Sequence, residues 1–313
     1  MAFVVTQSNT ATAATMTFVV YFDDAGLSDS IRERIRDVDR KHPSRVIVLD
    51  GTRDAEPGTT SHASREEWVE IPVRGSDANA IETAVAASAL CEAPIVLAWI
   101  ASTIAADERF PVLARRSQTV VCNSSIADGS TSALRELIGF IEAHPDIDIQ
   151  DLAYIRLLAW QDIVAEFFDD AHLLDDLFNL RSVEIIAGSD AEAYYFMGWL
   201  ASRLAWASCE KDRMCNREGA TIAFNVRRQG SPGRIDRIAL RTDATTYVAE
   251  VLDDDPAIAR VEALGFHAHD PRFVPLGGLD VASLIARAIV THRDPVFHET
   301  IALSKQIIDT QRG

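Results

Sequence analysis

The fold class is decided by residues 17–50, which read TFVVYFDDAGLSDSIRERIRDVDRKHPSRVIVLD. Two short apolar runs in this stretch are typical of strands, and the segment between them repeats its apolar residues at helical spacing. Ser30 and Glu33 are placed for a capping box at the helix start, and Pro43 ends the helix. The stretch therefore predicts, in order, a strand, a helix and a strand: Thr17–Phe22, Ser30–Lys41 and Arg45–Asp50.

The same alternation continues up to a junction at His144-Pro145-Asp146. The further strands and helices predicted before it are Trp68–Val73, Ile81–Leu90, Ile95–Ile100, Thr119–Asn123 and a helix around Leu134–Ile141. Strands that alternate with helices favour a mostly parallel sheet with helices on both faces. We therefore expect an N-terminal doubly wound α/β domain over residues 17–146, preceded by a disordered lead-in at residues 1–16.

Residues 147–313 follow a different pattern. Two long helices are predicted, with a short strand between them: Asp151–Phe168, Ala191–Trp206 and the strand Arg181–Ile186. Strand-like runs joined by turns and a helical end follow: Ala220–Arg228, Arg234–Arg241, Thr245–Leu252 and Leu279–Ile307. We expect a C-terminal α+β domain that contains an antiparallel meander.

The formal charge is −17, from 47 Asp and Glu against 30 Lys and Arg. Because nucleic-acid affinity comes largely from cationic contacts, a chain this acidic disfavours DNA or RNA as the main partner. The longest strongly apolar stretch, Ile95–Ala101, is too short to cross a bilayer, and residues 1–20 have no Lys or Arg to start a signal peptide. We therefore expect no membrane partner and a cytoplasmic location.

The four cysteines are expected to be reduced and mostly buried: Cys91, Cys122, Cys209 and Cys215. They form no CxxC pair and no cluster with histidines at metal-ligand spacing, so no metal site is predicted. The last two flank a short charged segment. They could come within disulfide distance if the preceding helix ends near Cys209.

Motifs for catalysis and for cofactor binding are missing. No glycine spacing gives GxGxxG or GxxxxGK, and the sequence has no GxSxG elbow and no HExxH, so no cofactor is predicted. Ser124 and Ser125 directly follow a predicted strand, where α/β folds often place functional groups. A turn serine that caps the next element is the simpler interpretation, and a cryptic enzyme that uses one of these serines is the alternative.

Two predicted helices each place a tryptophan and an arginine one turn apart, Arg156 with Trp160 and Trp199 with Arg203. We expect each guanidinium to stack near its indole. The pairs are either packing devices or, since Trp and Arg are enriched in interface hot spots, a surface that binds a protein partner. On the second helix, a stripe of small residues predicts close approach to a neighbour: Gly198, Ser202 and Ala205.

Five arginines fall within 15 residues of this acidic chain: Arg227, Arg228, Arg234, Arg237 and Arg241. They lie across a predicted hairpin. One interpretation is a solvated strand face. The alternative is a site for an acidic partner surface or a phosphorylated metabolite.

Six segments occur in a common order along the chain: HPSRVIVL (42–49), APIVLAW (93–99), VVCNSS (120–125), DLAYIRLLAWQDIVAEFFD (151–169), GWLASRL (198–204) and VPL with DPVFHETIAL (274–303). Together they resemble the glucose-6-phosphate dehydrogenase assembly protein OpcA family, over nearly the whole chain after the lead-in. GWLASR and the helix that contains Arg156 and Trp160 are the most specific. The family-motif residues are His42, Pro43, Arg45, Ser124, Ser125, Gly198 and Ser202.

The resemblance implies a non-catalytic partner that promotes assembly and allosteric activation of glucose-6-phosphate dehydrogenase, the entry step of the oxidative pentose phosphate pathway. It implies no cofactor of its own. The residues expected to bind the partner are Arg156, Trp160, Trp199, Arg203, Arg227, Arg237 and Arg241. The alternatives are a sugar-phosphate-sensing binding module and a divergent paralogue that acts on another metabolic enzyme.

Overall fold

A computed structural model describes residues 14–54, 68–126, 130–209, 213–277, 281–291 and 293–311. Most of the predicted lead-in, residues 1–13, lies outside the described residues. Within the described ranges, no helix combines the length and the apolar character needed to cross a membrane.

The N-terminal half is built on a parallel sheet of six strands in the order β3-β2-β1-β4-β5-β6. Its strands are β1 (Met16–Phe22), β2 (Ser44–Asp54), β3 (Trp68–Arg74), β4 (Ile95–Ile100), β5 (Thr119–Cys122) and β6 (Asp148–Asp151). The order reverses between β1 and β4, which is the arrangement of a doubly wound sheet. The predicted fold class of this half is confirmed.

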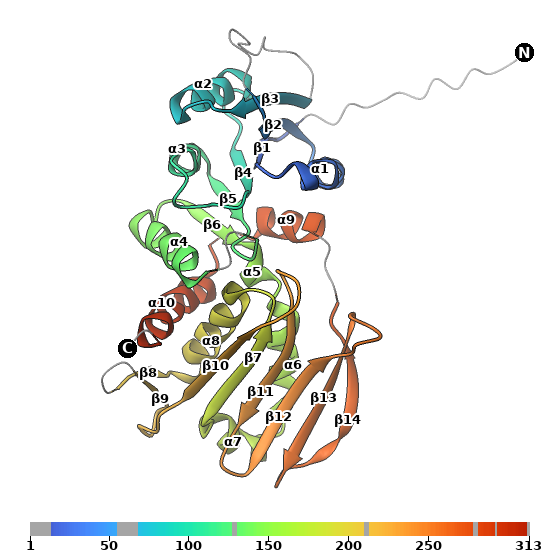
Figure 1. The fold of residues 1–313 in the computed structure, drawn as a ribbon, viewed down its shortest axis with the longest axis vertical. Helices are drawn as coiled ribbons and strands as arrows, with labels where there is room; N and C mark the ends of the chain where they lie inside the picture. The colour runs from blue at the N-terminus through green and yellow to red at the C-terminus, as the bar shows by residue number, and fades with distance from the viewer. Residues whose placement is uncertain are drawn as a thin grey trace, which may run out of the picture.

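Helices cover both faces of this sheet (Figure 1). One face packs against α2 (Ala78–Ser88), α3 (Arg109–Arg116) and α4 (Thr131–Ala143). The other packs against α1 (Ser28–Lys41), the short α5 (Leu152–Ile155) and, from the far end of the chain, α9 (Val281–Val290). Alternate residues of β1, β2, β4 and β5 enter the two cores, as the strand period of two requires.

The N-terminal half differs from the prediction in three details. Because α1 begins at Ser28, after a 3-10 turn at Ala25–Leu27, Ser30 lies inside the helix and the expected capping box is wrong. The sequence pattern also misses α3 and β6. The sequence of β6 is Asp-Ile-Gln-Asp, which has no apolar run, and its pairing with β5 lies beyond the predicted boundary at residue 146.

A second sheet of six strands forms the C-terminal half, in the order β10-β7-β11-β12-β13-β14. Its strands are β7 (Ser182–Ala187), β10 (Ala223–Arg228), β11 (Ile235–Arg241), β12 (Thr245–Val251), β13 (Ile258–Gly265) and β14 (His269–Pro275). β11 to β14 form an antiparallel meander, whereas β10 pairs in parallel with β7. The expected hairpin between β10 and β11 is therefore wrong, because β7 lies between them.

Helices pack on one face of the second sheet: α6 (Leu158–Phe167), α7 (Leu174–Phe178) and α8 (Asp190–Leu204), with α10 (Pro295–Thr310) along α8. A 3-10 turn at Ala171–Leu173 joins α6 to α7. The predicted helix Asp151–Phe168 is thus two helices, α5 and α6. Among the described residues, no helix lies on the opposite face of the sheet, which faces the viewer in Figure 1.

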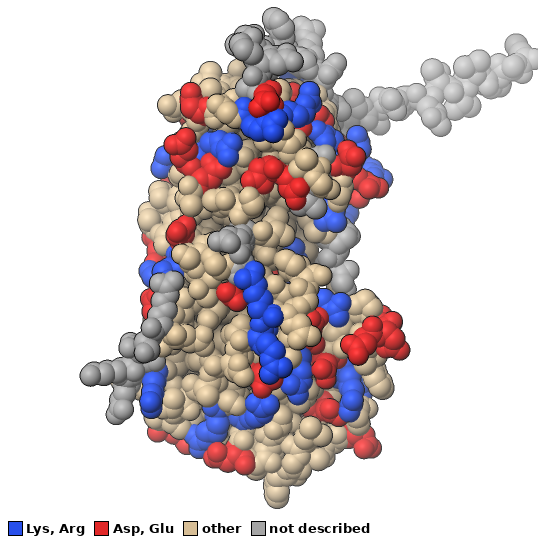
Figure 2. Space-filling model, in the orientation of Figure 1, with Lys and Arg blue, Asp and Glu red and all other residues tan. Residues whose placement is uncertain are grey.

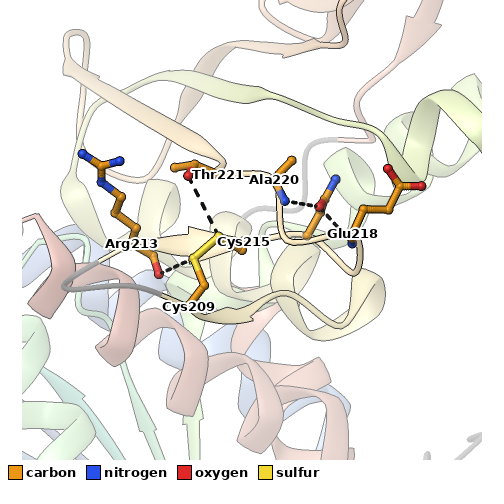
Figure 3. Close-up of a disulfide and its surroundings, with 7 residues drawn as sticks. Cys209, Arg213, Cys215, Glu218, Ala220 and Thr221 are labelled. Atoms are coloured by element: carbon orange, nitrogen blue, oxygen red, sulfur yellow. Dashed lines mark hydrogen bonds between the residues drawn. A yellow bond between two sulfur atoms is a disulfide. The ribbon is translucent and has the colours of Figure 1, made fainter.

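A small hairpin of β8 (Ala207–Ser208) and β9 (Met214–Cys215) follows α8. Cys209 and Cys215 form a disulfide across it, with their Cα atoms 5.7 Å apart (Figure 3). The left-handed conformation of Ala205 ends α8 before Cys209, so the chain can turn back. The expectation of reduced thiols is wrong for this pair. The free thiols are the buried Cys122 and the exposed Cys91.

Candidate functional site

The break between α5 and α6 places Arg156 at the junction of the two sheets. Asp151 caps α5, since its Oδ1 accepts a hydrogen bond from the Ala153 N–H (2.9 Å). Arg156 follows α5, and its Nη1 donates to Oδ1 of Asn123 (3.0 Å) and Oγ of Ser125 (2.9 Å). Both acceptors follow β5, so this side chain ties the helices of the second half to a strand end of the N-terminal sheet.

Glu192 completes this group from the first turn of α8. The run Ser189-Asp-Ala-Glu192 has the spacing of a capping box, and the Ser189 hydroxyl donates to the Glu192 carboxylate. The other carboxylate oxygen accepts from the Ser125 hydroxyl and lies 3.7 Å from Nη1 of Arg156. We define the junction cluster as Asn123, Ser125, Arg156, Ser189 and Glu192.

Burial sets the electrostatics of the junction cluster. The side chain of Glu192 is 1% exposed and that of Arg156 is 17% exposed. Burial raises the pKa of Glu192, and the hydrogen bonds from Ser125 and Ser189 oppose this change. Burial also lowers the pKa of Arg156, against the attraction of Glu192 and Asp151. A charged Glu192 or a charged Arg156 without its partner would lower the stability of the fold at this buried site. The charge of each side chain is therefore stabilised by the other.

Asp151 makes a second buried contact beside the junction cluster. Its Oδ1 also accepts from the Ser124 N–H (3.1 Å), and its Oδ2 accepts from the hydroxyl of Tyr195 on α8 (2.9 Å). Burial raises the pKa of Asp151. Of the two predicted site serines, Ser125 therefore holds a contact between the halves, whereas the N–H of Ser124 donates within the first sheet, to Asp151 of β6. Neither of them caps α4, because Ser130 occupies that position.

Neither predicted Trp/Arg pair stacks. Trp160 packs into the core beneath the second sheet, whereas Arg156 precedes α6 and points to the end of β5. Trp199 is partly buried, and Arg203 forms an ion pair with Glu299 of α10. The expected geometry is wrong at the first pair because a four-residue spacing aligns side chains only within one unbroken helix. At the second pair, a carboxylate from the neighbouring helix takes the guanidinium.

Gly198 lies where α8 and α10 approach closely. A Cβ atom at this position would lie 2.2 Å from Oγ of Ser304 and 2.5 Å from the carbonyl oxygen of Thr300. Only glycine fits such a contact without a shift of one helix. The predicted close approach through small residues is confirmed at Gly198. Ser202 of the same stripe turns its hydroxyl back to the main chain of α8.

The N-terminal motif residues fix the first sheet to its helices. The N–H of His42 donates to the carbonyl of Val38 in the last turn of α1 (2.8 Å). The carbonyl of Pro43 accepts from the Thr15 N–H (3.0 Å). Arg45 is buried in β2, and its Nε donates to the carbonyl of Ser88 at the end of α2 (3.1 Å). These contacts are structural, and they lie away from the junction cluster.

The uncovered face of the second sheet carries three of the five predicted arginines. The strand register places Arg227, Arg237 and Arg241 on this face, around Glu184 of β7. Glu184 accepts from Arg237 (3.2 Å) and from Arg241 (3.0 Å). Arg227 is exposed, and no described residue pairs with it. Basic residues run along this face in Figure 2, and we call it the open face.

The carboxyl ends of β1 and β4 are where a doubly wound sheet binds a dinucleotide. Here the turn after β1 carries Asp23 and Asp24. Asp23 accepts from the N–H (3.1 Å) and the hydroxyl (3.0 Å) of Ser102, and Asp24 accepts from the N–H of Gly26 (2.8 Å). In a dinucleotide-binding protein, free backbone amides of this turn would bind the pyrophosphate. Here two carboxylates occupy the turn, and their negative charge would repel a pyrophosphate. These residues do not fit a dinucleotide.

Sequence reasoning missed Asp151, Ser189, Glu192 and Tyr195 as junction residues. The capping-box spacing of Ser189 and Glu192 was a usable signal for the start of α8. No local pattern connects Glu192 to Arg156, because the contact joins elements that are separate in the chain.

Two family models match consecutive parts of the chain. The model described as the glucose-6-phosphate dehydrogenase subunit N-terminal domain matches residues 35–138, and the corresponding C-terminal domain matches residues 147–301. The chain is 29% identical to the putative OxPP cycle protein OpcA of Synechococcus elongatus over 195 aligned residues. The aligned region covers 55% of this chain and 42% of the relative. The protein of the same name from Synechocystis is 26% identical over 214 aligned residues, which cover 63% of this chain and 43% of that relative. The chain thus matches less than half of each relative.

Solved dehydrogenase structures share the fold. A 3-ketoreductase from Actinomadura kijaniata superposes with a TM-score of 0.54 at 11% identity, over 94% of this chain and 96% of that one. An aldose-aldose oxidoreductase from Caulobacter crescentus superposes with a TM-score of 0.54 at 12% identity, over 95% of this chain and 97% of that one. Identities this low show the fold alone. Because both family models match in order across both halves, the chain belongs to the OpcA family of glucose-6-phosphate dehydrogenase subunits.

Proposed function

We propose that the protein is a non-catalytic partner of glucose-6-phosphate dehydrogenase that promotes the assembled, active form of that enzyme. The ordered match to both domain models of the dehydrogenase subunit carries this proposal. The names of the curated relatives, which refer to the OxPP cycle, support the same pathway.

The chemistry of the chain supports a role without catalysis. At the crevice of the first sheet, Asp23 and Asp24 stand in place of a phosphate-binding turn, so the proposal includes no cofactor. The Ser125 hydroxyl, the candidate nucleophile, is held between Arg156 and Glu192, and the residue is 1% exposed. A hydroxyl so placed is committed to joining the two halves.

The open face supports a docking surface for the dehydrogenase. Its arginines stand out on a chain with a formal charge of −17, and they complement a partner surface that presents carboxylates. Glu184 holds Arg237 and Arg241 in place, whereas Arg227 is free to reach a partner. Among the predicted partner-binding residues, we therefore assign docking to the arginines of the open face rather than to the buried Arg156.

A kinetic titration tests the proposal. The purified protein should have no dehydrogenase activity alone, and at saturation it should raise the activity of the dehydrogenase from the same cell at low glucose 6-phosphate. Coupling between an effector and a substrate is typically about 1–3 kcal/mol, or roughly 5–150-fold in affinity. An unrelated acidic protein at the same concentration is the control. Identical kinetics with and without saturating protein would contradict the proposal.

A further inference from the structure

A cavity of about 800 Å³ lies between the two halves of the molecule. Its walls come from the α5–α6 break and α6, from α9, and from the strands and turns of the second sheet. This volume is within the range of about 300–1,000 Å³ that is typical of small-molecule sites. The junction cluster reaches it through Arg156 and Glu192.

Three arginines are among the residues that line this cavity. Arg156 and Arg234 line it, but Glu192 and Asp236 already compensate their charges. Arg287, in the last turn of α9, also lines it and is exposed. In the part of the chain that the structure describes, Arg287 has no ion-pair partner. A planar guanidinium without a carboxylate partner is suited to a phosphate group, which it can bind through two parallel hydrogen bonds.

Carboxylates on α6 supply a second set of polar groups. Asp162 and Glu166 are one helical turn apart, and both line the cavity. Asp162 is exposed and pairs with no described residue, and the described ion-pair partner of the Glu166 carboxylate is Arg272, at 3.9 Å. Carboxylate oxygens accept hydrogen bonds but donate none, so they suit a ligand with several hydroxyl groups.

Apolar side chains provide the rest of the surface. Trp160 lines the cavity together with Leu158 and Ile163 of α6, and Val251 and Leu276 face it from the second sheet. An apolar and aromatic lining with a few polar groups is the usual composition of a small-molecule site. Among the described residues, the cavity therefore presents the unpaired cation of Arg287, the carboxylates of Asp162 and Glu166, and an apolar wall.

We propose that this cavity binds a phosphorylated sugar, with its phosphate at Arg287 and its hydroxyl groups at Asp162 and Glu166. The carboxylates disfavour a ligand that is anionic throughout, such as a nucleoside triphosphate, because they would repel its charge. Because no described carboxylate compensates Arg287, its charge disfavours a neutral sugar. Binding here is a property of the isolated protein, so it holds or fails independently of the dehydrogenase.

Isothermal titration calorimetry on the whole protein tests this site with three probes: glucose 6-phosphate, glucose and inorganic phosphate. We expect saturable binding of glucose 6-phosphate and at least roughly tenfold weaker binding of each of the other two, because each satisfies only part of the site. Arg287→Ala should weaken glucose 6-phosphate binding roughly tenfold or more. Asp162→Asn should weaken glucose 6-phosphate but leave the weak phosphate binding unchanged.

Arg115→Ala is the matched control, because Arg115 is an exposed arginine of α3 outside the cavity. It should bind glucose 6-phosphate like the wild type. The proposal is overturned if glucose 6-phosphate shows no saturable binding, if Arg287→Ala binds it as tightly as the wild type, or if inorganic phosphate binds equally well. Loss of binding in Arg287→Ala together with an unchanged melting temperature would support it.

Discussion

The junction cluster and the open face use the same chemistry in different surroundings. In the junction cluster, Arg156 and Glu192 have side chains that are 17% and 1% exposed. On the open face, the side chains of Arg237 and Arg241 are 26% and 40% exposed, and they share Glu184, whose side chain is 11% exposed. Both sites pair arginine with glutamate across elements that are distant in the sequence. Arg156 and Glu192 also contact Asn123 and Ser125 at the end of β5, so their pair links the second half to the first sheet.

This difference teaches that the number of cations beside a buried carboxylate, together with burial, decides what each arginine contributes to stability. A buried ion pair depends on both members, since the loss of one leaves a charge in a poorly solvated place. On the open face, the Glu184 side chain is only 11% exposed, but it has two arginine partners, so the loss of one leaves the carboxylate paired with the other. Removal of one open-face arginine therefore costs less than removal of Arg156, which leaves Glu192 buried without a cation.

The largest expected effect is at Arg156. Arg156→Ala leaves Glu192 buried without its cation, and it also removes the donor to Asn123 and Ser125. We expect the free energy of unfolding to fall by about 3–5 kcal/mol, measured by urea denaturation. Arg237→Ala on the open face should cost only about 1 kcal/mol or less.

A double variant separates the buried charge from the lost packing. If the uncompensated carboxylate causes most of the loss, then Arg156→Ala with Glu192→Gln should be more stable than Arg156→Ala alone. Equal losses from Arg156→Ala and Arg237→Ala would contradict the distinction between the two regions.

A second prediction tests whether Gly198 matters because it lets α8 and α10 pack closely. Gly198→Ala places a methyl group against Thr300 and Ser304 of α10, so it should lower the free energy of unfolding by about 1–3 kcal/mol. The control is Gly139→Ala on α4, where a Cβ atom meets nothing within 4 Å. That change should raise stability by about 0.5–1 kcal/mol. A neutral Gly198→Ala would show that α8 and α10 can separate at little cost.

A third prediction concerns pH and the buried Asp151. Because its folded-state pKa is raised above the ordinary 3.8, the folded chain holds this proton more tightly than the unfolded chain. Its contribution to stability is therefore fully present below the ordinary pKa and is lost as pH rises through the raised pKa. Each unit of difference corresponds to about 1.4 kcal/mol. The free energy of unfolding, measured from about pH 4 (roughly the ordinary carboxyl pKa) upward, should fall less steeply in Asp151→Asn than in the wild type.

The asparagine at this position can keep the native contacts. Both backbone N–H groups donate to Oδ1, and the Tyr195 hydroxyl at Oδ2 can turn to accept from the amide. The exposed Asp162→Asn is the control, and its curve should follow that of the wild type. A curve for Asp151→Asn that is parallel to the wild type would show that Asp151 does not carry this pH dependence.

The smallest effect on stability is expected at Arg227. Because Arg227 is exposed and unpaired among the described residues, Arg227→Glu should change the free energy of unfolding by less than about 0.5 kcal/mol. It should nevertheless slow association with the dehydrogenase, since exposed charges mainly steer encounter. Stopped-flow association rates at two salt concentrations measure this effect. An unchanged rate at low salt would remove Arg227 from the docking surface.

The strands of the first sheet were predictable because most of them are buried on both faces and read as continuous apolar runs. β1, β2 and β4 are such runs, whereas β6 is polar and takes its place by pairing with β5. In the second half, the segments that became β10 and β11 were both predicted as strands. Their pairing was not predictable, because β7 enters between them from an earlier part of the chain.

The candidate site was predicted only in part. The resemblance marked Arg156, Ser125 and Gly198, and the structure places all three at contacts between elements. The expected stacking of Arg156 on Trp160 failed because the helix breaks before α6 begins. The partner of Arg156 was invisible in the sequence, since the choice of Glu192 depends on how α8 lies against the end of β5.

The sequence by itself determined the class of the fold, the positions of most helices and strands, and the family motifs, because these follow from local spacing and from short runs of residues. The tertiary structure decided which arginines are buried and which face solvent. It also brought Cys209 to Cys215 and left the cavity between the two halves. The physical reason is that burial and charge compensation depend on contacts between distant segments, and the packing of whole elements fixes those contacts.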